Sequence, residues 1–126
     1  FSKGSWRCRM YVDGFVVPVK KNRMEDYRKL ADLAGSLWTE HGALSVVEAK
    51  GDDIASGPFT SFPRAVLLAD DEVVFFSWIT FRDRAHRDAV NEKVMLDPRL
   101  SSDVEDPPFS MDRMIYGGFE VVVRRP

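Results

Sequence analysis

The sequence has almost no cysteine and no long apolar run, and both shortages narrow the kind of protein it can be. A single cysteine among 126 residues cannot form an internal disulfide, as fits a reducing compartment. No stretch approaches the roughly 20 apolar residues of a membrane-spanning helix. The apolar run after Arg9 is short and contains Asp13 and Gly14, so it does not resemble a secretory signal. We therefore expect a cytoplasmic protein with no membrane partner.

An excess of positive charge is also missing. The chain has 18 lysine and arginine residues against 20 acidic ones, a net charge of -2, which leaves no basic surface to grip a phosphate backbone. There is no Gly-x-Gly-x-x-Gly, no phosphate-binding loop, no His-Glu-x-x-His and no pair of cysteines at metal-binding spacing. We expect no nucleic-acid partner, no metal and no cofactor.

The length fits one domain with a modest core. Residues 1–9 are basic, contain glycine and show no periodicity, so we interpret them as an N-terminal extension, either native or added for expression. Residues 10–126 are then the single domain. Cys8 lies in the extension, and no neighbouring base or helix end would lower its pKa, so an inert thiol is expected.

What the chain does contain is four apolar runs with two helical segments between them. The runs predict strands at Val12–Val19, Leu44–Lys50, Val73–Phe81 and Met114–Val123. One helix is predicted from a cap at Asn22, with Glu25 completing a capping box, to Gly42; the other spans Arg84–Leu96, with Asp83 as its cap. The order strand–helix–strand–strand–helix–strand is typical of a ferredoxin-like subunit, an α+β fold with a four-stranded antiparallel sheet and two helices on one face.

The third predicted strand has large apolar side chains on both of its faces. Side chains alternate along a strand, so Phe75 and Phe76 point to opposite faces of the sheet. Two helices can cover only one face, and we therefore expect the other face to meet a second subunit in a homodimer.

Two long irregular segments, Gly51–Arg64 and Asp97–Arg113, are where function is expected. Segments of this length are lids, binding loops, arms on a partner or disordered chain. Their phenylalanines favour packing over disorder. Residues 62–68 are interpreted as an added strand or the beginning of the third strand's hairpin. Gly117-Gly118 indicates a bulge, or a close approach of another backbone or a ligand.

A few polar residues are embedded in the apolar strands, namely Asp13, Glu48, Ser77 and Tyr116. Buried polar groups need partners, and the available ones are Arg64, His86 and Arg113. These residues form either a network that fixes the dimer or the lining of a pocket between sheet and helices. The sequence leaves both alternatives open.

Each of the two histidines has a structural and a functional interpretation. His86 falls on the buried side of the second helix, either as a core-edge histidine bonded to the sheet, which is the commoner case, or as a catalytic or ligand-binding group. His41 lies in the last turn of the first helix, where it either packs against the helix end and bonds a free carbonyl or serves as a catalytic base.

Several strings carry a resemblance to a known family: MYVDGFVVPV, FPRAV, FSW, RAHRDAVNEKVM, DPR and RMIYGGF. From Met10 to Val123 the chain resembles a family of small uncharacterised bacterial proteins in the dimeric α+β barrel superfamily, whose members typically begin at the position of Met10. The resemblance implies a ferredoxin-like subunit whose sheet packs on a second copy. Some members carry a label tied to signal-recognition-particle RNA, which the acidic balance of this chain does not favour.

Relatives in that superfamily include haem-degrading and cofactor-independent monooxygenases, dye-decolorising peroxidases and small dehydratases or isomerases, with pockets between sheet and helices. Our hypothesis is a homodimer that binds a small, partly apolar molecule in a pocket bordered by Asp13, Arg64, Trp78, His86 and Tyr116. The alternatives are a small cofactor-independent enzyme of oxygenase or isomerase type and a purely structural dimer. A pocket with convergent polar groups favours binding or catalysis, and a filled core with every polar group paired favours the structural role.

Overall fold

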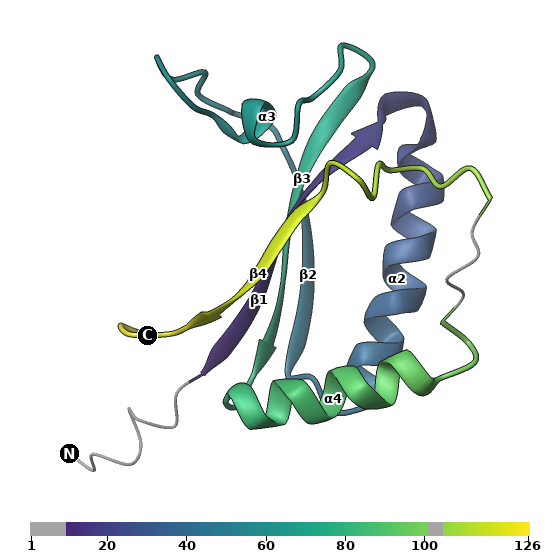
Figure 1. The fold of residues 1–126 in the computed structure, drawn as a ribbon, viewed down its shortest axis with the longest axis vertical. Coiled ribbons are helices and arrows are strands. Elements are labelled where there is room, and N and C mark those ends of the chain that lie inside the picture. Colours follow the sequence, from purple (N-terminus) through teal and green to yellow (C-terminus); the bar gives the residue numbers. More distant parts are fainter. Residues whose placement is uncertain (1–9, 101–104) are drawn as a thin grey trace.

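The predicted α+β fold is confirmed in a computed structural model, which describes residues 10–100 and 105–126 (Figure 1). The strands are β1 (Tyr11–Lys20), β2 (Ser45–Lys50), β3 (Glu72–Phe81) and β4 (Ile115–Glu120). The helices are α2 (Met24–Glu40), the single turn α3 (Phe62–Ala65) and α4 (Arg84–Leu96), with a 3-10 turn η1 at Lys21–Arg23. All neighbouring strands are antiparallel in the order β2-β3-β1-β4, the arrangement of a ferredoxin-like sheet. The predicted extension, residues 1–9 with Cys8, lies outside the described residues.

The helix ends follow the predicted signals except at the start of α2. Asp83 caps α4, where its Oδ1 accepts the His86 backbone N–H at 2.7 Å. The predicted capping box at Asn22 is wrong, because the chain turns out of β1 directly into η1 and α2 begins only at Met24, without a side-chain cap. Glu25 pairs instead with Arg28, one turn further along α2. Gly42 ends α2 as predicted, with a φ of +118° that favours glycine.

The prediction of a strand at residues 62–68 is also wrong. Ser61 accepts the Arg64 backbone N–H at 3.1 Å through its hydroxyl, and Pro63 follows in the first turn, so this segment begins as a helix. Phe62 packs edge-on against Phe76 of β3 at 5.8 Å between ring centroids. Residues before and after α3 form an arm that stands out from the sheet on the side away from α2 and α4 (Figure 1).

The two faces of the sheet differ in cover. Helices α2 and α4 lie over one face, which we call the helix face, and the opposite one is the open face (Figure 1). Phe75 is 9% exposed and Phe76 is 45% exposed, so the prediction that they point to opposite faces is confirmed. Most of the core lies on the helix face, where Val19, Leu37, Phe81 and Val94 are fully buried. A smaller cluster of Val16, Val66 and Val74 is buried on the open face, under the segment that follows α3.

The two glycines in β4 make room for aromatic rings. The pairing of β1 with β4 is one-to-one from Tyr11–Glu120 to Val16–Ile115, so the predicted bulge is wrong. A Cβ on Gly118 would lie 2.7 Å from Cε2 and 2.9 Å from Cζ of Tyr11, which means that the Tyr11 ring occupies the place of a side chain there. The close approach that the sequence indicated is made by a ring of the same subunit.

An ion pair joins the start of β3 to the segment before β4. The Arg113 guanidinium donates to both carboxylate oxygens of Glu72, at 2.8 and 2.5 Å, and to the carbonyl oxygen of Leu67 at 2.9 Å. Residues after α3 are thereby held against those before β4. Within residues 10–100 and 105–126, no helix combines the length and apolar character needed to cross a membrane.

Candidate functional site

A hollow between α2 and the sheet is the best candidate for a site. Its inner part measures about 150 Å³ and adjoins an outer part of about 510 Å³ that opens along the β2 edge. The walls of the inner part are mainly apolar and come from both layers: Phe15, Val17, Ala31, Ala34, Val46, Ile79 and Met114. This is the composition of a small-molecule site, provided that a few polar groups converge on it.

Small residues on α2 leave this space unfilled. Ala31, Ala34 and Gly35 all line the hollow, and a Cβ on Gly35 would stand 3.2 Å from Val46 Cγ1. One turn before Ala31, the Tyr27 ring closes the end of the hollow by packing on Phe75 at 4.8 Å between centroids. The helix therefore approaches β2 closely at Gly35, and the small side chains of Ala31 and Ala34 leave the space beside that contact unfilled.

Two polar side chains lie on the sheet side of the hollow. Glu48 and Ser77 are direct partners in the β2–β3 register, so their side chains lie next to each other on the helix face. Ser77 is only 4% exposed, and its hydroxyl makes no hydrogen bond to any residue in the described part of the chain. The Ser77 oxygen keeps some access to the hollow, so a molecule bound there can form a hydrogen bond with it.

Tyr27 supplies the third polar group. Its hydroxyl donates to Glu48 Oε1 at 2.7 Å. Desolvation raises the pKa of Glu48, and the bond from Tyr27 lowers it by less. Burial also raises the pKa of Tyr27, and the neighbouring Glu48 raises it further. Tyr27 thus keeps its proton at neutral pH, while the second oxygen of Glu48 stays free to accept from a ligand.

A second polar group on the helix face is paired except at Arg87 Nε, which is buried without a hydrogen-bond partner among the described residues. Asp13 is 6% exposed, lies 3.4 Å from Arg87 Nη1 and accepts from Asn91 at 3.4 Å. The Trp38 indole donates to Asn91 Oδ1 at 2.9 Å, and Arg87 donates to the Tyr11 hydroxyl at 3.1 Å. Burial raises the pKa of Asp13, and Arg87 opposes that rise. The chain of bonds joins β1, α2 and α4, which is a structural role.

The five residues predicted to border one pocket do not meet around one cavity. Asp13 belongs to the paired group, and Arg64 donates to the Gly57 carbonyl oxygen at 2.9 Å in the arm. His86 bonds to neither the sheet nor any of the partners expected for it: its Nδ1 accepts the Arg82 backbone N–H at 3.0 Å, at the start of its own helix. Only Trp78 and Tyr116 line a common hollow, and it lies on the open face.

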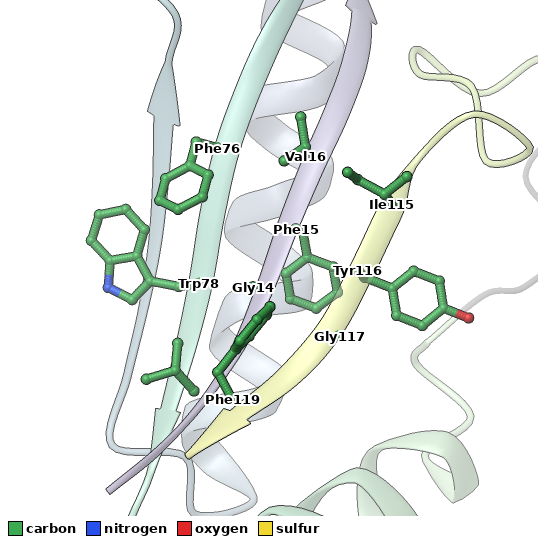
Figure 2. A pocket seen from close by; sticks show the side chains of 10 residues that line it. Gly14, Phe15, Val16, Phe76, Trp78, Ile115, Tyr116, Gly117 and Phe119 are labelled. Carbon is green, nitrogen blue, oxygen red and sulfur yellow. The ribbon is translucent and has the colours of Figure 1, made fainter. Parts of the chain in front are cut away.

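This open-face hollow measures about 570 Å³ and is lined by apolar strand residues (Figure 2). Gly14 and Gly117 face each other across β1 and β4, and the Phe119 ring lies over both, 3.5 Å and 3.8 Å from the positions of their missing Cβ atoms. Phe76 and Trp78 stand on β3, while the Tyr116 ring points away at the β4 edge (Figure 2). No charged residue lines this hollow, so it resembles a packing surface more than a chemical site.

One group of potential metal ligands is present among the described residues. Glu40, His41 and Asp97 offer ligand atoms within 4.8 Å of one another. Arg99, however, donates to both Glu40 and Asp97, and its hydrogen bonds to Asp97 hold the pKa of that carboxyl well below its ordinary range. His41 bonds Asp97 at 2.8 Å instead of the free carbonyl expected for it. The group is an ion-pair network that fastens the end of α2 to the end of α4.

The sequence contained a signal for the hollow that the predicted site did not use. Glu48 and Ser77 were recognised as polar residues inside apolar strands, but their direct pairing depends on the β2–β3 register. Tyr27 fitted the apolar stripe of α2, and only the fold brings its hydroxyl to Glu48.

Comparison with known proteins identifies relatives of this chain. Residues 10–111 match a family described as "Protein of unknown function (DUF1428)". The chain is 45% identical over 113 residues to "Uncharacterized protein YbaA" of Escherichia coli (strain K12), which covers 90% of this chain and 97% of the relative. The protein of the same description from Shigella flexneri matches to the same extent. Tyr27, Glu48 and Ser77 all lie inside the matched segment.

Proposed function

Since this chain belongs to the bacterial family described as "Protein of unknown function (DUF1428)", we propose its function from its own geometry. It is a homodimer, and each subunit binds a small, partly apolar molecule in the hollow between α2 and the sheet. Neither nucleic acid nor a membrane is part of this function.

The observation that carries the proposal is the unpaired Ser77 hydroxyl, which is 4% exposed in an apolar hollow and next to Glu48. The hydroxyl lines the hollow and has no partner in the described part of the chain, so a ligand with one polar group can form a hydrogen bond with it there. A purely structural dimer would have its core filled and its polar groups paired, as Asp13 is. The hollow fits binding better than it fits a structural role.

The homodimer is supported by the character of the open face. Phe76 on β3 is 45% exposed, and Ile115 and Phe119 on β4 are 45% and 62% exposed; β3 and β4 flank β1 on either side. A contiguous apolar surface of this kind is uncommon on soluble monomers. No charged residue lines its central hollow, so two copies can meet there without burying an unpaired charge. A dimeric α+β barrel is the arrangement that results.

The raised pKa of Glu48 favours one alternative, an enzyme of isomerase type. Glu48 is solvent-exposed as a residue on the edge strand, and only part of its carboxylate faces the hollow; such a carboxylate can accept a proton from a bound substrate, and the Ser77 hydroxyl beside it can donate to developing charge. Binding of a small molecule is common to both functions and is tested first.

The test is an NMR titration with benzyl alcohol, which joins an apolar ring to one hydroxyl. We expect amide shifts at Ala31, Glu48 and Ser77, with saturation. Ala31→Leu should abolish them, because the larger side chain enters the hollow, whereas Lys29→Leu, on the exposed side of the same helix, should leave them unchanged. Thermal melts establish that both variants are folded.

Shifts confined to the open face, or none at all, would overturn binding in this hollow. Light scattering on the same samples tests the homodimer separately. A monomer mass at micromolar concentration would overturn that part of the proposal.

A further inference from the structure

Two carboxylates, Glu48 and Asp32, and one guanidinium, Arg28, line the hollow, and neither carboxylate forms an ion pair within the described residues. Glu48 receives one hydrogen bond, from the neutral Tyr27 hydroxyl, and within the described residues it forms no ion pair. Asp32 lines the outer part and forms no ion pair there either. Arg28 lines the same outer part, but its guanidinium is turned to Glu25, to which it donates three hydrogen bonds of 2.7 to 3.1 Å.

The acidic residues alone would not make a site, but Ser77 points to a ligand independently. Ser77 is more than nine-tenths buried as a residue, it lines the inner hollow, and its hydroxyl is unpaired within the described part of the chain. It lies next to Glu48 because the two residues are register partners. A ligand group placed between them can donate to a carboxylate oxygen and to a hydroxyl oxygen at once.

An ammonium group meets this requirement better than a hydroxyl or a carboxylate. It carries three donors and no acceptor, so one N–H can donate to Glu48 and a second to Ser77 Oγ. The bond to Glu48 is charge-assisted, and such bonds are roughly twice as strong as neutral ones. The aromatic rings of Tyr27 and Phe75 also line the outer part, and ring faces attract cations.

We infer that the ligand of this hollow is a small primary amine, held through its ammonium group by Glu48 and Ser77, with a short apolar body against Ala31, Val46 and Phe75. The inference rests on the proposed function and adds the charge of the ligand to it. Anionic molecules with the same body are rejected, because Glu48 and Asp32 repel them.

The test compares three probes that share one ring and differ in charge: benzylamine, benzyl alcohol and benzoate. Each is titrated against the full chain at about neutral pH and moderate salt, with amide shifts at Glu48 and Ser77 as the readout. Benzylamine should bind about fivefold more tightly than benzyl alcohol, as expected for an ion pair to a carboxylate that is partly exposed. Benzoate should bind more weakly than either.

Variants assign the charge preference to Glu48. Glu48→Gln should remove the advantage of benzylamine over benzyl alcohol and leave benzyl alcohol bound. Ser77→Ala should weaken both probes. Glu92→Gln, an equal change of charge on the exposed side of α4, should leave all three affinities unchanged.

The outcomes separate this inference from the proposed function. Binding of benzyl alcohol in the hollow without a preference for benzylamine would overturn the inference and leave the proposed function intact. A preference for benzylamine that survives Glu48→Gln would overturn the assignment to Glu48. Absence of binding by all three probes would overturn both.

Discussion

The Tyr27 hydroxyl donates to Glu48 Oε1 at 2.7 Å, and this bond ties the first turns of α2 to the edge strand β2. It also stabilises the ionised form of Glu48, because a hydrogen bond to a carboxylate opposes the rise in pKa that desolvation causes. This hydrogen bond therefore affects both the packing of α2 on β2 and the charge of the hollow.

Tyr27→Phe should raise the pKa of Glu48 and lower the free energy of unfolding by about 1 kcal/mol, since one hydrogen bond is lost and the ring remains. The pKa of Glu48 in the folded state lies above its ordinary value, so Glu48 stays protonated to higher pH in the native state than in the unfolded state. The free energy of unfolding therefore falls as the pH rises from the ordinary pKa to the raised one. The fall should be larger in the variant. Carboxyl carbon NMR of Glu48 and urea unfolding measure the two effects, and Tyr116→Phe, at an exposed ring, is the control that should change neither.

Gly118→Ala and Gly117→Ala form a matched pair on neighbouring positions. A Cβ on Gly118 would enter the ring of Tyr11, whose hydroxyl and ring face are held by Arg87. A Cβ on Gly117 would meet the Phe119 ring at an ordinary 3.8 Å. We expect Gly118→Ala to lower the free energy of unfolding by about 1–3 kcal/mol and Gly117→Ala to change it much less. Equal effects on the urea midpoint would show that the Tyr11 ring moves aside freely.

Arg113→Met should destabilise the fold, because it leaves the Glu72 carboxylate without its cation. The Arg113 side chain is partly exposed, so the loss should be smaller than for a pair enclosed in a core. The hydrogen bonds from Arg113 lower the pKa of Glu72, so the pair stabilises the native state above the ordinary pKa of a glutamate, and that contribution is lost as the pH falls through the lowered value. Urea unfolding at about pH 7 and about pH 3 should show a smaller acid loss in the variant than in the parent chain. Glu72→Gln keeps a hydrogen-bonding group and should cost less.

His86→Ala should leave probe binding in the hollow unchanged, because the ring bonds the Arg82 backbone N–H and packs on Phe81, away from Glu48 and Ser77. We expect a loss of about 1 kcal/mol in the free energy of unfolding, as for one local hydrogen bond and a partly buried ring. A thermal melt and the benzyl alcohol titration measure both. If the folded His86→Ala variant no longer bound benzyl alcohol, the prediction would be wrong and His86 would belong to the binding site.

The sequence predicted the strands and helices well because their signals are local. Period-two alternation placed Phe75 and Phe76 on opposite faces, and Asp83 marked the start of α4. The start of α2 was missed because its capping pattern is overridden by the turn out of β1. Site residues were harder, since a pocket depends on contacts between elements. The direction of His86 was set by a bond to its own helix start, and the pairing of Glu48 with Ser77 was set by strand register.

Phe75→Glu and Phe76→Glu separate folding from assembly. Phe75 packs on Tyr27 and Val17 in the core of the helix face, so a carboxylate there would be buried without a partner, and we expect the chain not to fold at about 25 °C. Phe76 is 45% exposed on the open face, so a Phe76→Glu subunit should fold and melt at nearly the temperature of the parent chain. The substitution places a charge in the proposed dimer interface. Light scattering should then give the mass of a dimer for the parent chain and of a monomer for Phe76→Glu, with circular dichroism reporting the fold. A dimer that tolerates Phe76→Glu would place the interface elsewhere, because two carboxylates facing each other across a buried apolar surface cannot be accommodated.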